Sequence, residues 1–130
     1  MTVLVDHNVE GQAALLWSTL VAEGVPELFP AEFVTFSQVG LPCESSDRAV
    51  WRFAQENGLV LLTGNRRMVG ADSLELTIRE DNTVDSLPVL TISNVNRIFR
   101  KAYRERCAVR LLEILMDLDN YRGIGRLFIP

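Results

Sequence analysis

The sequence is poor in the residues that form disulfides or bind soft metals. It has one histidine, His7, and two cysteines, Cys43 and Cys107. The cysteines lie far apart in the chain and match no metal-ligand or redox spacing, so we expect two free thiols and no redox chemistry. A single histidine without a second histidine or a cysteine nearby is more typical of a local hydrogen-bonding residue than of a ligand or a general base.

Long apolar runs are also absent. No segment approaches the roughly 20 apolar residues that span a bilayer. The first residues, MTVLVDHN, lack the basic region and the cleavage site of a signal peptide. We therefore expect a protein of the cytoplasm with no membrane segment.

Excess positive charge is the third feature that is missing. The formal net charge is −4, so binding to nucleic acid would require a local basic patch on an acidic protein. Twelve of the thirteen basic residues are arginine, and Lys101 is the one lysine. The planar guanidinium group can bind a phosphate or a carboxylate through two parallel hydrogen bonds.

The length and composition favour one globular domain. The chain has 130 residues, 48% of them hydrophobic, which is enough to build a single core. We see no internal repeat, no low-complexity segment and no linker. Residues 1–130 are therefore predicted to form a single domain.

Short apolar runs alternate with amphipathic segments along the chain. Strands buried on both faces are typically continuous apolar runs, and this alternation predicts an α/β fold with a mainly parallel sheet and right-handed crossovers. Pro130 can donate no ladder hydrogen bond, which favours an edge position for the last strand. The predicted strands are Val3–Val5, Phe33–Phe36, Leu59–Leu62, Pro88–Ile92 and Arg126–Pro130. The predicted helices run from Ala13 to Gly24, from an N-cap at Ser45 to Gly58, from Ala71 to Glu80, and from a cap at Asn94 or Asn96 to Gly123, the last as one helix or two with a bend.

Polar residues follow the first and third predicted strands. In open α/β sheets, sites form beyond the carboxyl ends of the strands. Asp6 ends the first strand, Asp47 begins the helix before the third, and Thr63, Gly64 and Asn65 follow the third. Three of these residues also have a structural interpretation: Asp6 as a turn cap, Asp47 as a residue favoured by the helix dipole, and Asn65 as a left-handed turn residue.

The combination of these residues resembles the PIN-like nuclease superfamily. The segment SSDRAVWRFAQENGLVLLTGNRRM is similar to a small PIN-related branch, whose pattern is an aspartate, a helix of the type AxxxG and a strand that runs into TxDxxF or TxDR. The resemblance covers Val3–Asp6 and Ser46–Met68, and elsewhere only the order of elements. It implies a three-layer α/β/α sandwich in which acidic side chains hold Mg²⁺ or Mn²⁺ and phosphodiester bonds, usually of RNA, are cleaved.

The resemblance assigns roles to individual residues. It implies that Asp6 and Asp47 are metal ligands and that Thr63 orients a carboxylate or a water. Asn65 stands where the family commonly has aspartate, and an amide oxygen is a weaker ligand than a carboxylate. Asp72 as a third metal ligand, or Glu75, would compensate for this difference; the alternative is that both residues only begin a helix.

Arginines border the same turn. We expect Arg48, Arg52, Arg66 and Arg67 to neutralise a nucleic-acid backbone. The alternative is that they pair with Glu10, Glu44 or Glu56 at the surface. A second basic run, RIFRKAYRERCAVR, spreads its charges over more than one helix face, so that part of it can flank the groove. Tyr103 in this run is either half buried or a base-stacking residue.

The leading hypothesis is a metal-dependent ribonuclease that hydrolyses phosphodiester bonds with a metal-activated water. A close variant is the toxin of a toxin–antitoxin pair, with an antitoxin peptide over the acidic notch. The alternative, favoured by Asn65, is a catalytically inactive PIN-derived module that binds RNA or protein. A phosphotransfer domain fits less well, since it needs a lysine at a late strand end and Lys101 follows no strand. The predicted C-terminal edge strand makes a homodimer reasonable.

Overall fold

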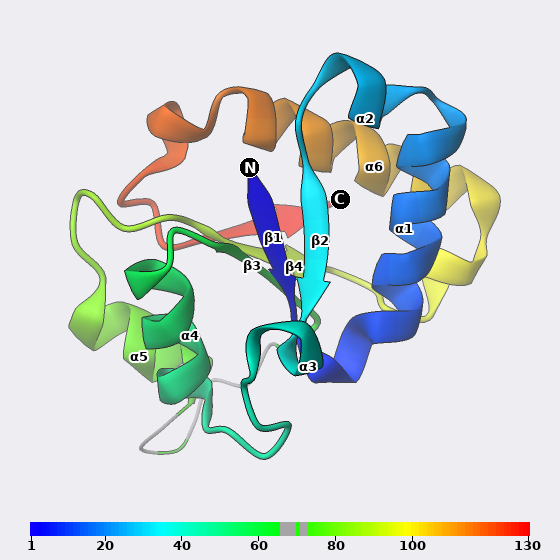
Figure 1. The fold of residues 1–130 in the computed structure, drawn as a ribbon. Helices are drawn as coiled ribbons and strands as arrows, with labels where there is room; N and C mark the ends of the chain where they lie inside the picture. The colour runs from blue at the N-terminus through cyan, green and yellow to red at the C-terminus, as the bar shows by residue number, and fades with distance from the viewer. Residues whose placement is uncertain (66–69, 71–72) are drawn as a thin grey trace.

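The computed structural model describes residues 1–65, 70 and 73–130. Its centre is a five-stranded parallel sheet of order β2-β1-β3-β4-β5 (Figure 1). Helices cover both faces of the sheet, so the predicted α/β/α sandwich is confirmed. The strands are β1 (Thr2–Val5), β2 (Glu32–Thr35), β3 (Val60–Thr63), β4 (Val89–Ile92) and β5 (Arg126–Ile129).

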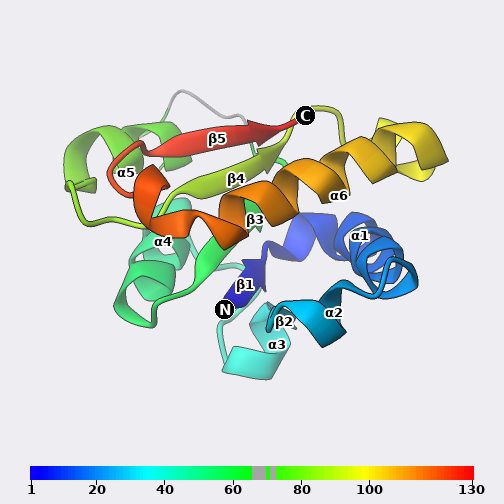
Figure 2. The ribbon, with the colours of Figure 1, turned by 90° about the horizontal axis from the view of Figure 1, so that it is seen from above.

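The strands alternate their side chains between two cores. Helices α1 (Glu10–Ala22), α2 (Val25–Leu28) and α6 (Lys101–Met116) cover one face, where Val5 and Leu62 are buried. Helices α3 (Phe36–Val39), α4 (Asp47–Glu56) and α5 (Leu74–Asp81) cover the other face, where Leu4 and Leu61 are buried (Figure 2). Both faces of β1, β3 and β4 are therefore packed, which explains their continuous apolar sequences. Three short 3₁₀ helices complete the described elements: η1 (His7–Val9), η2 (Arg97–Phe99) and η3 (Leu118–Tyr121).

The last crossover has the opposite hand to the first three. Helices α1 and α6 lie on the same face, but the chain steps from β1 to β2 in one direction along the sheet and from β4 to β5 in the other (Figure 1). The first three crossovers are right-handed as predicted, and the β4–α6–β5 crossover is left-handed, so the prediction is wrong there. On the other face, α5 already covers the start of β5: a Cβ at Gly125 would lie 3.0 Å from Cγ2 of Ile78.

The helix boundaries differ from the predictions in local detail. The second strand ends at Thr35, not at Phe36, because Thr35 and Gln38 form a capping box that begins α3. Ser46, not Ser45, caps α4 by accepting a hydrogen bond from the N–H of Ala49. The third predicted helix is observed as α5, and its first predicted residues, 71 and 72, lie outside the described residues. The last helical region is divided into η2, α6 and η3.

Within the residues that the structure describes, no helix combines the length and the apolar character required to cross a membrane.

The two thiols differ in accessibility, which gives a first prediction. Cys43 is exposed and Cys107 is buried in α6, where burial raises the pKa of its thiol to about 11. At pH 8 only about one in a thousand Cys107 side chains is then a thiolate, the reactive form. We expect the native protein to release one equivalent of thiolate product from a disulfide reagent such as DTNB at pH 8, and the guanidinium-unfolded protein to release two. Fast reaction of both thiols in the native state would contradict the packing of α6.

Candidate functional site

Asp6 and Thr63 end neighbouring strands, and their side chains meet. The ladder between β1 and β3 continues one residue further, since the N–H of Asp6 donates to the carbonyl oxygen of Leu62 at 2.9 Å. The Thr63 hydroxyl donates to Oδ2 of Asp6 at 2.6 Å and accepts the N–H of Asn65 at 2.9 Å. Oδ1 of Asp6 accepts the N–H of Asn8 at 3.3 Å, so Asp6 also caps η1. The predicted role of Thr63 in orienting a carboxylate agrees with this geometry.

Asp47 joins three segments of the chain. It is the first residue of α4, and its Oδ2 accepts hydrogen bonds from Nδ2 of Asn65 at 2.9 Å and from the N–H of Leu74, the first residue of α5, at 3.1 Å. Within the described residues no donor reaches Oδ1 of Asp47. Both hydrogen bonds that Asp47 accepts from the described residues thus go to Oδ2.

Asp6, Asp47 and Asn65 line one cleft of about 410 Å³ together with Asn8, Val9, Gly64 and Val95. The cleft lies beyond the carboxyl ends of β1 and β3, where the strand order reverses, which is the usual place for a site in an open α/β sheet. Gly64 is required here because a Cβ would lie 2.5 Å from Cγ1 of Val95 and 3.0 Å from Cγ1 of Val9. No non-glycine residue in the described ranges has a positive φ, so Asn65 is not left-handed.

Glu75 points to a different partner. Its Oε2 lies 3.3 Å from Nη2 of Arg126, and Nη1 of Arg126 donates to the backbone oxygen of Asn65 at 2.6 Å and to the Thr91 hydroxyl at 2.7 Å. Glu75 is therefore part of an ion pair and is not among the residues that line the cleft. Asp72, the other predicted compensating residue, lies outside the described residues.

Arg126 was not identified from the sequence. Only 10% of its side chain is exposed, and it connects β5 to the turn that carries Asn65 and to α5. An arginine in an apolar edge strand is a weak signal for such a role, and nothing in the sequence indicated its partners. Val9 and Val95 in the cleft wall were missed in the same way, although both follow strand ends.

The two described arginines of the predicted phosphate-binding set pair with α5. Arg48 contacts Glu80 at 2.6 Å and Asp81 at 2.9 Å, and Arg52 contacts Asp81 at 3.0 Å. The hydrogen bond to Glu80 raises the pKa of Arg48. Surface pairing thus occurs, with α5 carboxylates in place of the three glutamates considered above. Arg66 and Arg67 lie outside the described residues.

The donors in the cleft fit a hard divalent cation held by few protein ligands. Residues 1–65, 70 and 73–130 contain no group of three or more His, Cys, Asp or Glu side chains placed to hold a metal. Mg²⁺, however, usually keeps several waters and is bound through one or two carboxylates together with substrate phosphates. Asp6 and Asp47 supply two carboxylates to one cleft, which meets that requirement. His7 pairs with Glu10 at 3.4 Å and does not line the cleft.

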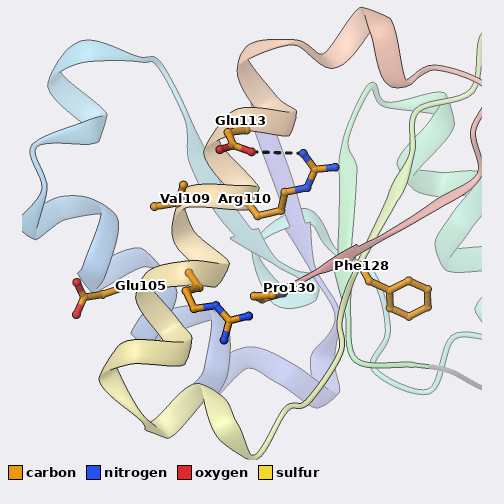
Figure 3. Close-up of a pocket in the computed structure, with 7 residues that line it drawn as sticks. Glu105, Val109, Arg110, Glu113, Phe128 and Pro130 are labelled. Atoms are coloured by element: carbon orange, nitrogen blue, oxygen red, sulfur yellow. Dashed lines mark hydrogen bonds and ion pairs between the residues drawn. The ribbon is translucent and has the colours of Figure 1, made fainter.

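A second hollow, of about 470 Å³, lies between α6 and β5 (Figure 3). Val109, Phe128 and Pro130 form its apolar part, and Arg110 pairs with Glu113 at 3.4 Å on its rim. Figure 3 shows Glu105 directed away from that pair. Because no two carboxylates converge among its lining residues, this hollow fits the chemistry of the predicted site less well than the cleft.

Comparison of the chain with protein-family models, curated proteins and solved structures gives no match.

The contacts of Arg126 predict its contribution to stability. Arg126→Met would leave the backbone oxygen of Asn65, the Thr91 hydroxyl and Glu75 without their shared cation, at a cost of about 2–3 kcal/mol. We expect a lower midpoint of urea unfolding with an unchanged slope. The same substitution at exposed Arg79 is the control and should cost less than about 0.5 kcal/mol. Equal midpoints for the two variants would show that Arg126 does not brace the turn.

Proposed function

We propose that the protein is a metal-dependent ribonuclease whose site is the cleft beyond the carboxyl ends of β1 and β3. The supporting observation is that Asp6 and Asp47, far apart in the sequence, line this cleft with Asn65. The resemblance of the segment around Asp47 and Thr63 to PIN-like nucleases points to the same chemistry. The proposal makes RNA the substrate and Mg²⁺ or Mn²⁺ the cofactor.

The residues of the cleft would have separate roles in such a site. When bound, the metal supplies a water of lowered pKa and neutralises charge on the phosphate. Thr63 restrains Asp6, and the N–H of Leu74 with the amide of Asn65 restrains Asp47, so both carboxylates are held before substrate arrives. A cleft of about 410 Å³ leaves room for a phosphate and several waters, each of about 30 Å³.

A second candidate is an inactive module that binds RNA or protein. The observation in its favour is the hydrogen bond from Nδ2 of Asn65 to Oδ2 of Asp47, which an ionised aspartate at position 65 could not donate. An antitoxin over the cleft and a homodimer through the edge of β5 remain predictions on either reading. The two candidates differ in turnover, and the two experiments below separate them.

RNA cleavage tests the enzyme directly. Purified protein with Mn²⁺ should cut single-stranded RNA, and Asp47→Asn should lower the rate at least about a hundredfold, because it removes a charge from the site. Glu56→Gln, an exposed change at the end of the same helix, should leave the rate unchanged. Asn65→Asp should raise it. If all variants cut RNA equally fast, the cleavage comes from a contaminating nuclease and the ribonuclease proposal fails.

Metal binding is measured separately by thermal unfolding. A ligand that binds only the native state stabilises it, and Mn²⁺ at ten times its Kd adds about 1.4 kcal/mol, or roughly 5 °C in Tm. Asp6→Asn should abolish this shift while leaving the Tm of the metal-free protein within a few degrees of the parent. Asp85→Asn, in an exposed loop, should keep the shift. The same shift in Asp6→Asn would exclude Asp6 as a ligand. A shift without cleavage would favour the inactive module.

A further inference from the structure

The connection from β4 to α6 presents an exposed aromatic ring among cations. Phe99, the last residue of η2, is 62% exposed, and Arg97, Arg100 and Lys101 around it are also exposed. We call these four residues the η2 surface. An exposed phenylalanine within a group of three cations is unusual for a protein whose net charge is −4.

Within the described residues the cations of the η2 surface have no acidic partner, in contrast to five other arginines. Carboxylates pair with Arg48, Arg52, Arg110, Arg122 and Arg126. In the described parts of the chain, 1–65, 70 and 73–130, no carboxylate pairs with a cation of the η2 surface. Arg97 instead lies over the ring of Tyr103, with 4.8 Å from Cζ to the ring centroid. These cations are available to an anion from outside the protein.

The η2 surface is firmly held although its side chains are exposed. Ile98 between Arg97 and Phe99 is fully buried, and its carbonyl oxygen accepts a hydrogen bond from Nη1 of Arg104 at 3.0 Å. Oδ1 of Asn94 accepts the N–H groups of Asn96 and Arg97, both at 3.2 Å, and the N–H of Asn94 donates to the Tyr103 hydroxyl at 3.0 Å. Phe99 thus projects from a fixed backbone, which lowers the entropy lost when a flat ligand binds.

The η2 surface continues from the cleft. Val95 lines the cleft, and the four residues follow it within six positions, at the carboxyl edge of the sheet (Figure 1). η2 also packs against α1, whose chain leads back through η1 to Asp6. A strand with a phosphate in the cleft can therefore pass next over η2.

We propose that the η2 surface binds single-stranded RNA next to the cleft, with one base stacked on Phe99 and the phosphates on Arg97, Arg100 and Lys101. The route of the strand rests on the proposed function of the cleft. Stacking on an exposed ring requires an unpaired base, because a duplex hides its base faces. A net charge of −4 opposes binding to an anionic membrane or to a long duplex, whereas a short strand contacts only the local cations.

Binding measured in EDTA tests the η2 surface without cleavage. The probe is a short fluorescein-labelled oligouridylate, followed by anisotropy between about 50 and 200 mM salt. Phe99→Ala should raise Kd at least about fivefold, since stacking of one base contributes on the order of 1–3 kcal/mol. Phe99→Trp should restore the affinity. Replacing all three cations by glutamine should reduce the slope of log K against log salt by up to about 2, at roughly 0.7 per phosphate.

Matched controls separate the η2 surface from general effects. Val109→Ala removes another exposed apolar side chain, 58% exposed on α6, and Arg79→Gln removes an exposed cation on α5. Both should bind like the parent, and every variant should keep its Tm within about 2 °C because the altered side chains are exposed.

Three outcomes would overturn the proposal. The first is an unchanged Kd for Phe99→Ala, and the second is an equal loss of affinity in either control variant. The third is that polyglutamate competes with the oligonucleotide on the parent protein but not on Phe99→Ala, which would make the η2 surface an acidic-peptide site. Failure of the ribonuclease proposal is recognised separately, since it shows as absence of cleavage with Mn²⁺ while the EDTA measurement still decides for or against the η2 surface.

Discussion

The arrangement of the cleft depends on one hydroxyl group. Thr63 donates its hydrogen to Asp6 and accepts the N–H of Asn65, so a single side chain fixes the end of β1 relative to the turn after β3. Asn65 then reaches Asp47, which holds the start of α5 through Leu74. These hydrogen bonds place two like-charged side chains in one cleft, and the donors that the described residues provide to each carboxylate are neutral.

The sheet was predictable because a strand that is buried on both faces has a continuous apolar sequence. β1, β3 and β4 appear as apolar runs, and the glycines and caps between them mark the helices. The hand of the last crossover was not predictable, since the apolar stripe of α6 fits either face and the choice depends on which face α5 has already covered. α3 was missed because its capping box lies in a segment that also has a strand-like composition.

The cleft was predicted in part. Asp6, Asp47 and Asn65 follow strand ends or begin a helix, and parallel strands bring such positions to one edge of the sheet. The pairing of charges was not predictable. Glu75 was expected near the metal and pairs with Arg126. Arg48 was expected to pair with a glutamate such as Glu44 or Glu56, which are nearer in the sequence, and it pairs with Glu80. Such choices depend on distances between elements far apart in the sequence, which composition and spacing do not determine.

The left-handed crossover leads to a strand that follows every residue of the cleft in the chain. Among the described elements β5 pairs with β4, and α6, which leads to β5, packs on α1. Arg126 travels with β5, so the turn at Asn65 gains its support from a strand that leaves the ribosome after every residue of the cleft. A nascent chain that has not yet released β5 therefore lacks the Arg126 contact that supports the turn beside the two carboxylates.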